Sequence, residues 1–176
     1  MGFIGFFRYS ELAKIKECDL QFFEDHLEIF VESSKTDQYR DGAVVVIACT
    51  GTDYCPVAML ERYMRLANIS IANLSDNDLF RRLISTKNGQ NLRDSANLSY
   101  TRARELVLAM LESIGLDRKQ FSLHSLHSGG ASAAANAGVP DRHFKRHGWW
   151  RSESAKDGYV QDRIEERLSV SKKLGL

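Results

Sequence analysis

Apolar residues recur at helical spacing along much of the chain. Between Pro56 and Ala67 they fall at positions 57, 60, 63, 64 and 67, and a proline at the first position is typical of a helix start. A longer apolar stripe follows Ser99 and runs to Ile114, so we expect Ser99 to cap this helix, Gly115 to end it and the stripe to be buried. The pattern predicts helices over residues 3–16, 56–67, 99–114 and 162–173, and further helices that begin at His124 and Pro140.

Other stretches have the patterns of strands. Residues 20–31 alternate, with Leu27, Ile29 and Val31 on one face, and residues 43–49 form a continuous apolar run that we expect to be covered on both faces. The polar residues 32–42 between them predict a long hairpin loop. A short strand is expected near residues 79–84, inside a polar segment of turns. These elements predict an α+β fold, mainly α-helical, with a small antiparallel sheet of two or three strands on one side.

The composition fits one globular domain. The 176 residues are 43% hydrophobic and 27% charged, which are ordinary values for a chain that buries a core. Lys and Arg number 24 against 23 Asp and Glu, a net charge of +1. This balance excludes a polycation, so any nucleic-acid surface must be a local patch. We therefore expect a single domain over residues 1–176.

The cysteine pattern indicates an intracellular compartment, and the sequence gives no reason to expect a cofactor. Cys18, Cys49 and Cys55 have no metal-binding or redox-motif spacing, and an odd number of cysteines is typical of free thiols in a reducing, intracellular environment. The longest apolar run, residues 43–49, is too short to cross a membrane. No cluster of Asp and Glu and no Cys/His ligand set argues for a metal, so neither a metal nor a cofactor is expected.

The segment from His124 to Tyr159 has the residues for phosphate chemistry. His124 and His127 are three positions apart, so both rings project from one helix face. Gly, Ala and Ser fill residues 128–135, which allows close packing against a neighbour. Trp150 follows a second short helix, and Tyr159 stands nine positions after Trp150. Two imidazoles, an indole and a phenol are thereby expected to converge.

A second motif lies near the start of the chain. Gly5 is followed by Arg8, Glu11 and Leu12 in the pattern Gly-x-x-Arg-x-x-Glu-Leu. Together, the two motifs resemble the catalytic core of the tyrosine recombinase (phage integrase) family, and most of all the enzymes of animal mobile elements of the DIRS and Crypton kind. The resemblance covers nearly the whole chain. It implies a recombinase that cuts and rejoins double-stranded DNA through a 3′-phosphotyrosyl intermediate, with no small-molecule substrate.

The resemblance assigns a role to each matching residue. Tyr159 matches the nucleophile, and Arg8 matches the arginine that holds a non-bridging phosphate oxygen, with Glu11 fixing its rotamer. His124 matches the acid/base or phosphate ligand. Trp150 matches a position that packs beside the nucleophile and donates to phosphate. Lys35, on the expected hairpin loop, matches the general acid for the leaving 5′ oxygen, although a solvated loop lysine is the commoner fate.

One matched position departs from the family. His127 stands where the family has its second phosphate-binding arginine. An imidazole lacks the two-pronged fork of a guanidinium. The alternative hypothesis is therefore a catalytically dead or domesticated DNA-binding or assembly module on the same fold.

The resemblance also has implications for DNA-binding residues, for an N-terminal domain and for the C-terminal tail. A local basic cluster fits phosphate binding, but an ordinary solvated face fits about equally well. The candidate DNA-binding residues are Arg81, Arg82, Lys87, Arg93, Arg146 and Arg151. Family members carry further helices and a core-binding domain before this point, so the chain is expected to be N-terminally truncated. Residues 162–176 have few apolar anchors and are expected to pack loosely or to reach a second protomer on DNA. An animal mobile element implies a nuclear location.

Overall fold

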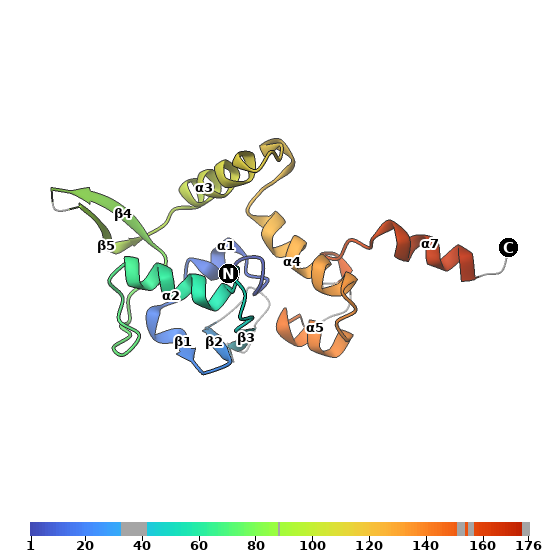
Figure 1. The fold of residues 1–176 in the computed structure, drawn as a ribbon, viewed down its shortest axis with the longest axis horizontal. Helices are drawn as coiled ribbons and strands as arrows, with labels where there is room; N and C mark the ends of the chain where they lie inside the picture. Colours follow the sequence, from blue (N-terminus) through green and yellow to red (C-terminus); the bar gives the residue numbers. More distant parts are fainter. Residues whose placement is uncertain (33–41, 88, 151–153, 155–156, 174–176) are drawn as a thin grey trace.

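The computed structural model describes residues 1–32, 42–87, 89–150, 154 and 157–173. Two predicted site residues, Lys35 and Arg151, lie outside this part of the chain. A small sheet and helix α2 form one part of the molecule, and helices α4 and α5 form another (Figure 1). The α+β class with a small antiparallel sheet is confirmed.

Three antiparallel strands form the sheet, in the order β1 (Leu20–Phe22), β2 (His26–Val31) and β3 (Ala43–Ala48). The predicted strand over residues 20–31 is broken by a tight turn, in which the Phe23 amide donates to the His26 carbonyl oxygen (2.9 Å). The sheet buries only one face. Val45 and Ile47 are fully buried, but Val44 and Val46 are about half exposed, so the prediction that residues 43–49 are covered on both faces is wrong. Successive side chains of a strand point to opposite faces, but because all the residues of this run are apolar, the sequence does not show that one face is exposed.

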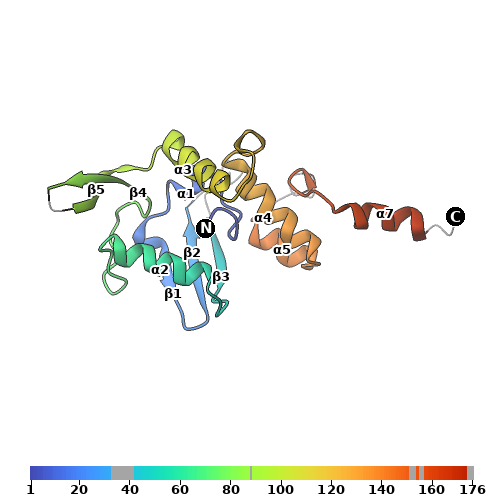
Figure 2. The ribbon, with the colours of Figure 1, turned by 45° about the horizontal axis from the view of Figure 1, so that its top comes forward.

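Helix α2 (Pro56–Leu66) has the predicted bounds within one residue and covers the buried face of the sheet (Figure 2). Its Leu60 and Met64 join the core formed by the inward strand residues. The 3-10 turn η1 (Glu17–Asp19) connects the N-terminal segment to β1.

The N-terminal segment is not the long helix predicted over residues 3–16. Only α1 (Tyr9–Leu12) is helical, and Phe6 has a positive φ of 50°. The two adjacent phenylalanines explain the difference, because they enter separate cores. Phe7 packs in the sheet core, whereas Phe6 packs with Phe144 and Trp150. Neighbouring residues of a helix cannot point in such different directions, so the backbone turns between them.

A second antiparallel pair was only half predicted. The short strand near residues 79–84 corresponds to β4 (Arg81–Thr86), and it pairs with β5 (Gly89–Asn97) in a hairpin that projects from the body (Figure 1). The sequence of β5, GQNLRDSAN, is polar and has no alternation. It therefore gives no strand signal, and the pairing itself defines the strand.

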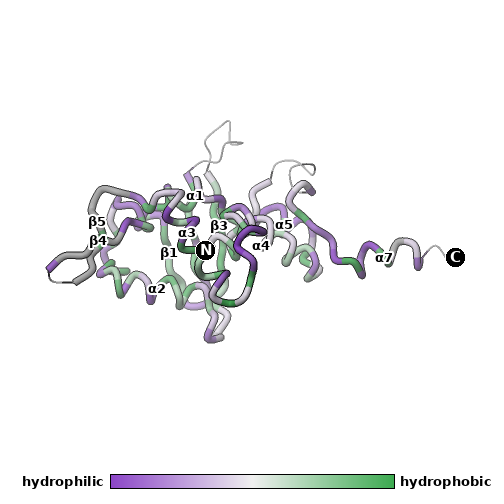
Figure 3. The backbone as a smooth tube through the Cα atoms, turned by 90° about the horizontal axis from the view of Figure 1, so that it is seen from above, coloured by the Kyte–Doolittle hydropathy of each residue, from purple (hydrophilic) through white to green (hydrophobic). Residues whose placement is uncertain are grey.

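Helix α3 (Tyr100–Ser113) begins as predicted, since the Ser99 hydroxyl accepts a hydrogen bond from the Arg102 amide (3.3 Å). Its apolar stripe, however, is not buried. Leu108 alone is buried among the residues of this helix, all of which the structure describes, while Met110 and Ile114 at its end are 55% and 68% exposed. The stripe is an amphipathic face with little protein against it. Green apolar stretches lie along the strands and α2, and also along α7 (Figure 3).

The C-terminal half places the predicted motif on two packed helices. The 3-10 turn η2 (Arg118–Gln120) leads into α4 (His124–Asn136), and α5 (Asp141–His147) packs on α4. A β-carbon on Gly130 would lie 1.9 Å from the Phe3 carbonyl oxygen, so this position requires glycine. Helix α7 (Ile164–Lys173) extends away from the body (Figures 1 and 2). None of the helices within the described residues is long and apolar enough to cross a membrane.

Candidate functional site

The two ends of the chain meet at Arg8 and Tyr159. Nη2 of Arg8 donates a hydrogen bond to the Tyr159 hydroxyl oxygen (3.1 Å), and the guanidinium carbon lies 5.4 Å from the centre of the phenol ring. Glu11 holds the arginine from the other side. Its carboxylate accepts from Arg8 Nη1 (2.9 Å) and from the Arg8 amide (2.7 Å). The Glu11 side chain is 4% exposed and that of Arg8 is 29% exposed, so the Arg8 side chain remains partly accessible to solvent.

Electrostatics keep Arg8 charged. Partial burial lowers the pKa of the guanidinium, but the hydrogen bond with Tyr159 and the Glu11 carboxylate outweigh burial and raise the pKa above its ordinary value. A permanent positive charge therefore lies against the Tyr159 oxygen.

His127 is the most deeply buried polar member of the site. It is 2% exposed, and its Nδ1 is hydrogen-bonded to the Phe6 carbonyl oxygen. Because a carbonyl only accepts, Nδ1 carries the proton and Nε2 is the bare nitrogen. Burial, and then the charge of Arg8, lowers the pKa of His127 to about 4. His127 is thus a neutral imidazole at pH 7, and it cannot supply the charge of an arginine.

The aromatic rings of the site surround Tyr159. The ring of His127 meets the phenol edge-on, with centroids 4.6 Å apart. His124, one turn earlier on α4, lies 5.4 Å from the phenol and 5.3 Å from His127. His124 is solvent-exposed, whereas His127 is buried, so His124 is the histidine of the pair that is accessible from solvent.

Trp150 forms the floor of this aromatic cluster. Its indole stacks on Phe6 (5.8 Å) and on Tyr159 (6.1 Å), and it contacts Phe144 (4.9 Å). The side chain is buried, and its Nε1 has no hydrogen-bond partner among the described residues. A buried donor without a partner is uncommon in folded proteins.

Two residues of α4 fix the Tyr159 segment, and the sequence reasoning missed both. The Ser132 hydroxyl donates to the Tyr159 carbonyl oxygen (3.2 Å) and accepts from the Gln161 amide (3.0 Å). Asn136 donates to the Gln161 carbonyl oxygen (2.9 Å) and accepts from the Arg163 amide (3.0 Å). The two residues are one helical turn apart, so they share a face of α4. The spacing of four between these two polar residues was a signal that could have indicated a helix face that binds another segment of the chain.

The candidate DNA-binding residues divide into three groups. Arg81 is withdrawn from any DNA surface, because its side chain is 8% exposed and pairs with Glu17 (2.7 Å). This interaction corrects its prediction as a phosphate contact. Arg82 and Lys87 on the β4–β5 hairpin and Arg146 on α5 are exposed. The side chain of Arg93, like Lys35 and Arg151, lies outside what the structure describes.

Two further features of the described residues concern His147 and metal binding. His147 is structural, since its Nε2 is hydrogen-bonded to the Ile4 carbonyl oxygen (2.8 Å) and its ring packs edge-on against Phe6. Within the described part of the chain, no group of three or more His, Cys, Asp or Glu side chains could hold a metal ion.

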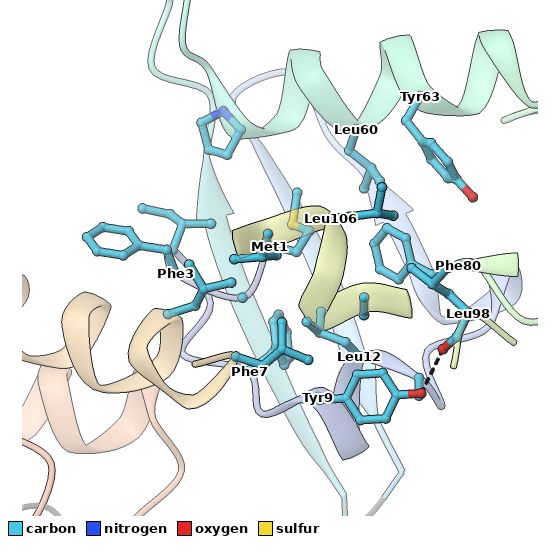
Figure 4. Close-up of a pocket in the computed structure, with 18 of the residues that line it drawn as sticks. Met1, Phe3, Phe7, Tyr9, Leu12, Leu60, Tyr63, Phe80, Leu98 and Leu106 are labelled. Carbon is cyan, nitrogen blue, oxygen red and sulfur yellow. Dashed lines mark hydrogen bonds between the residues drawn. The ribbon is translucent and has the colours of Figure 1, made fainter. Parts of the chain in front are cut away.

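A large apolar groove lies away from Tyr159. It has a volume of about 630 Å³ and is formed by the first residues of the chain, α2 and α3 (Figure 4). Met1, Phe7, Leu60 and Leu106 line it, and Tyr9 closes one end by donating to the Leu98 carbonyl oxygen (2.6 Å). The exposed stripe of α3 forms one wall.

Solved structures show the class of this fold. The XerH site-specific recombinase, in a post-cleavage complex with palindromic difH DNA, gives a TM-score of 0.71 with 14% identity, over 99% of this chain and 43% of that one. The XerA recombinase gives 0.66 with 20% identity, over 98% and 54%. The Tn1549 transposon integrase, in complex with circular intermediate DNA, gives 0.57 with 12% identity, over 98% and 55%. The chain has the tyrosine recombinase catalytic fold.

Sequence comparison supports the same class. An integrase/recombinase of Selenomonas ruminantium, described as a xerD homolog, is 30% identical over 162 residues, which are 92% of this chain and 45% of that protein. No protein-family model matches the chain. The chain is similar in sequence to this integrase/recombinase and has the tyrosine recombinase catalytic fold, and it spans less than half the length of this curated relative. The resemblance to DIRS and Crypton elements in particular remains a prediction.

Proposed function

We propose that this chain is the catalytic domain of a site-specific recombinase or integrase that cuts and rejoins DNA through Tyr159. The observation that carries the proposal is the hydrogen bond between Arg8 and the Tyr159 hydroxyl. It places a cation where both a phenolate and a phosphate would be stabilised. The rings of His124 and Trp150 lie around the same phenol.

The chemistry exchanges one phosphodiester for another. The Tyr159 oxygen attacks phosphorus while the bond to the 5′ oxygen breaks, so the 3′ phosphate becomes esterified to tyrosine and a 5′ hydroxyl is released. Arg8 offers a second N–H to a non-bridging oxygen. His124 takes the phenol proton, and Lys35 is the proposed donor to the leaving 5′ oxygen. A 5′ hydroxyl that attacks the phosphotyrosine reverses these steps and reseals the strand.

The proposed partner is double-stranded DNA. The XerH structures are complexes with difH substrate, and the Tn1549 integrase is in complex with circular intermediate DNA. In this chain the exposed Arg82, Lys87 and Arg146 supply phosphate contacts. The reaction would take place wherever the cell holds this DNA, which is the nucleus if the host is an animal.

A catalytically dead DNA-binding module is the second candidate, and His127 favours it. Neutral and buried, His127 offers phosphate no positive charge and no N–H donor, because its proton is used on Phe6. Loss of one preorganised donor costs about 10²–10³ in rate in comparable sites. The two candidates share the fold and the DNA surface, and they differ only in the covalent step.

We also propose that the domain works with further protein. The apolar groove and the exposed stripe of α3 fit additional helices of a longer chain, in keeping with an N-terminally truncated catalytic domain. At the other end, α7 carries Ile164 (56% exposed) and Leu168 (45% exposed) away from the body, which fits docking on a second protomer on DNA. Deleting residues 164–176 should then abolish higher-order complexes on DNA in sedimentation experiments while single-site binding persists.

The covalent step is tested with a nicked suicide substrate, which traps the phosphotyrosyl adduct. A protein–DNA adduct that maps to Tyr159 supports the recombinase. DNA binding with no adduct, even from a chain with an arginine at position 127, supports the binding module.

A further inference from the structure

Two cysteines outside the recombinase site lie at the junction between β3 and α2. Cys49 directly follows β3 and is exposed, and its amide donates to the Asp25 carbonyl oxygen (2.8 Å). Cys55 is buried at the N-cap of α2. The stretch from Cys49 to Cys55 turns through Gly51, whose positive φ of 65° is a conformation that favours glycine.

The turn brings the Cys55 thiol beside the end of β3, where Cys49 lies. The amide of Thr50, the residue bonded to Cys49, donates to Sγ of Cys55 (3.4 Å), and the Cys55 amide donates back to the Thr52 carbonyl oxygen (3.0 Å). Partial desolvation, and then the charge of Cys55, raise the pKa of the Cys49 thiol. The turn therefore holds the Cys55 sulfur beside the peptide group that joins Cys49 to Thr50.

The environment of the two sulfurs differs. Amide groups at the start of α2, together with that of Thr50, lower the pKa of Cys55 to about 7. A thiolate fraction near neutral pH makes Cys55 a nucleophile. Cys49 has the higher pKa but is the sulfur that solvent reaches.

We propose that Cys49 and Cys55 form a reversible thiol–disulfide site, in which a small-molecule disulfide converts the pair to an intramolecular disulfide across the β3–α2 turn. The exposed Cys49 thiolate attacks the small disulfide, forms a mixed disulfide and releases one small thiol. The Cys55 thiolate then attacks the Cys49 sulfur and expels the second small thiol. Two protein thiols are oxidised, and one small disulfide is reduced to two thiols.

The bond would act on the edge of the apolar groove. Cys55 caps the helix whose Pro56, Met59 and Leu60 line the groove. Oxidation would link the start of α2 covalently to the end of β3, and would thereby restrict movement of the α2 side of the groove.

The test uses the natural chain in glutathione buffers of increasing oxidised fraction, followed by alkylation and trypsin digestion. Both cysteines lie in the single tryptic peptide 41–62. We expect this peptide to escape alkylation on oxidation and to be lighter by the two lost hydrogens. The rate at which the mixed disulfide closes should rise with pH around a midpoint near 7, as the Cys55 pKa requires, and not near the ~8.5 of an ordinary thiol. Alkylation of both cysteines at every oxidised fraction would overturn the proposal, as would a glutathione adduct on Cys49 that never closes.

Two variants control the experiment. Cys18→Ser removes the third cysteine, which is exposed elsewhere, and should leave closure unchanged. Cys55→Ser should trap glutathione on Cys49, because the resolving thiolate is gone. Closure that needs Cys18 would assign the chemistry to a different pair and overturn the proposal.

Discussion

Arg8 and Tyr159 lie 151 positions apart in the sequence and are joined by a hydrogen bond of 3.1 Å. The contact brings the start of the chain against its C-terminal quarter. It also unites the two motifs that carry the family resemblance, since Arg8 belongs to one and Tyr159 ends the other. Every proposal about catalysis depends on this pair.

The pH dependence of folding should report the burial of His127. Its folded pKa of about 4 lies below the unfolded value of 6.5, so between these values the unfolded chain binds a proton that the folded chain does not. The free energy of unfolding should therefore fall as pH drops from 6.5 to 4, by up to about 3 kcal/mol. Urea unfolding at a series of pH values measures this loss.

The matched variant for that measurement is His127→Asn. Its amide can donate to the Phe6 carbonyl oxygen as Nδ1 does, but it does not titrate. The difference in stability between the two chains should shrink steadily below pH 6.5. A constant difference from about pH 8 to pH 4 would mean that His127 is not buried in its neutral form.

His127→Arg should raise DNA cleavage by about 10²–10³, provided that the chain is supplied with its full DNA clamp. A guanidinium stays protonated and offers parallel donors to two phosphate oxygens. Because the pKa of His127 is about 4, the natural chain should gain no activity from protonation of His127 as pH falls toward 6.5. Adduct yields between about pH 8 and pH 6 should show no gain from protonation of His127.

Ser132→Ala should slow cleavage about tenfold, because two hydrogen bonds that fix the Tyr159 segment are lost. DNA affinity should not change, since the Ser132 hydroxyl bonds to the backbone of the protein itself. Ser128→Ala is the control on the same helix, because its hydroxyl bonds to the His124 carbonyl oxygen within α4. Equal rates for the two variants would show that Ser132 does not position the nucleophile.

Arg81 and Arg82 should behave oppositely although they are adjacent. Arg82→Ala removes an exposed charge and should reduce the slope of log affinity against log salt by about 0.9 without affecting stability. Arg81→Ala leaves Glu17 buried without its cation and should cost about 3–5 kcal/mol of stability. Salt titrations and unfolding curves distinguish the two effects.

The sequence predicted those parts of the fold that local pattern determines. Ser99 and Pro56 start helices where expected, because capping and proline geometry act within one turn. The sequence-based prediction was wrong where contacts between residues distant in the sequence determine the structure. The adjacent Phe6 and Phe7 enter different cores, and the polar β5 is a strand only through its pairing with β4.

The candidate site followed the same rule. The motifs identified Arg8, His124 and Tyr159, which the fold brings together. They could not show that Arg81 is paired with Glu17, 64 positions away, or that His127 is held neutral by burial. The charge state and the exposure of a side chain depend on the residues around it in the fold, and a sequence motif does not include those residues.

The most direct test compares covalent adduct yield on a nicked suicide substrate for three chains: the natural one, His127→Arg, and His127→Arg combined with Tyr159→Phe. We predict a low yield from the natural chain, a yield about 10²–10³ higher from His127→Arg, and none from the double variant, all at equal DNA binding. An adduct that persists without the Tyr159 hydroxyl would contradict the assignment of the nucleophile. Absence of any adduct from His127→Arg, with DNA bound, would contradict the catalytic account.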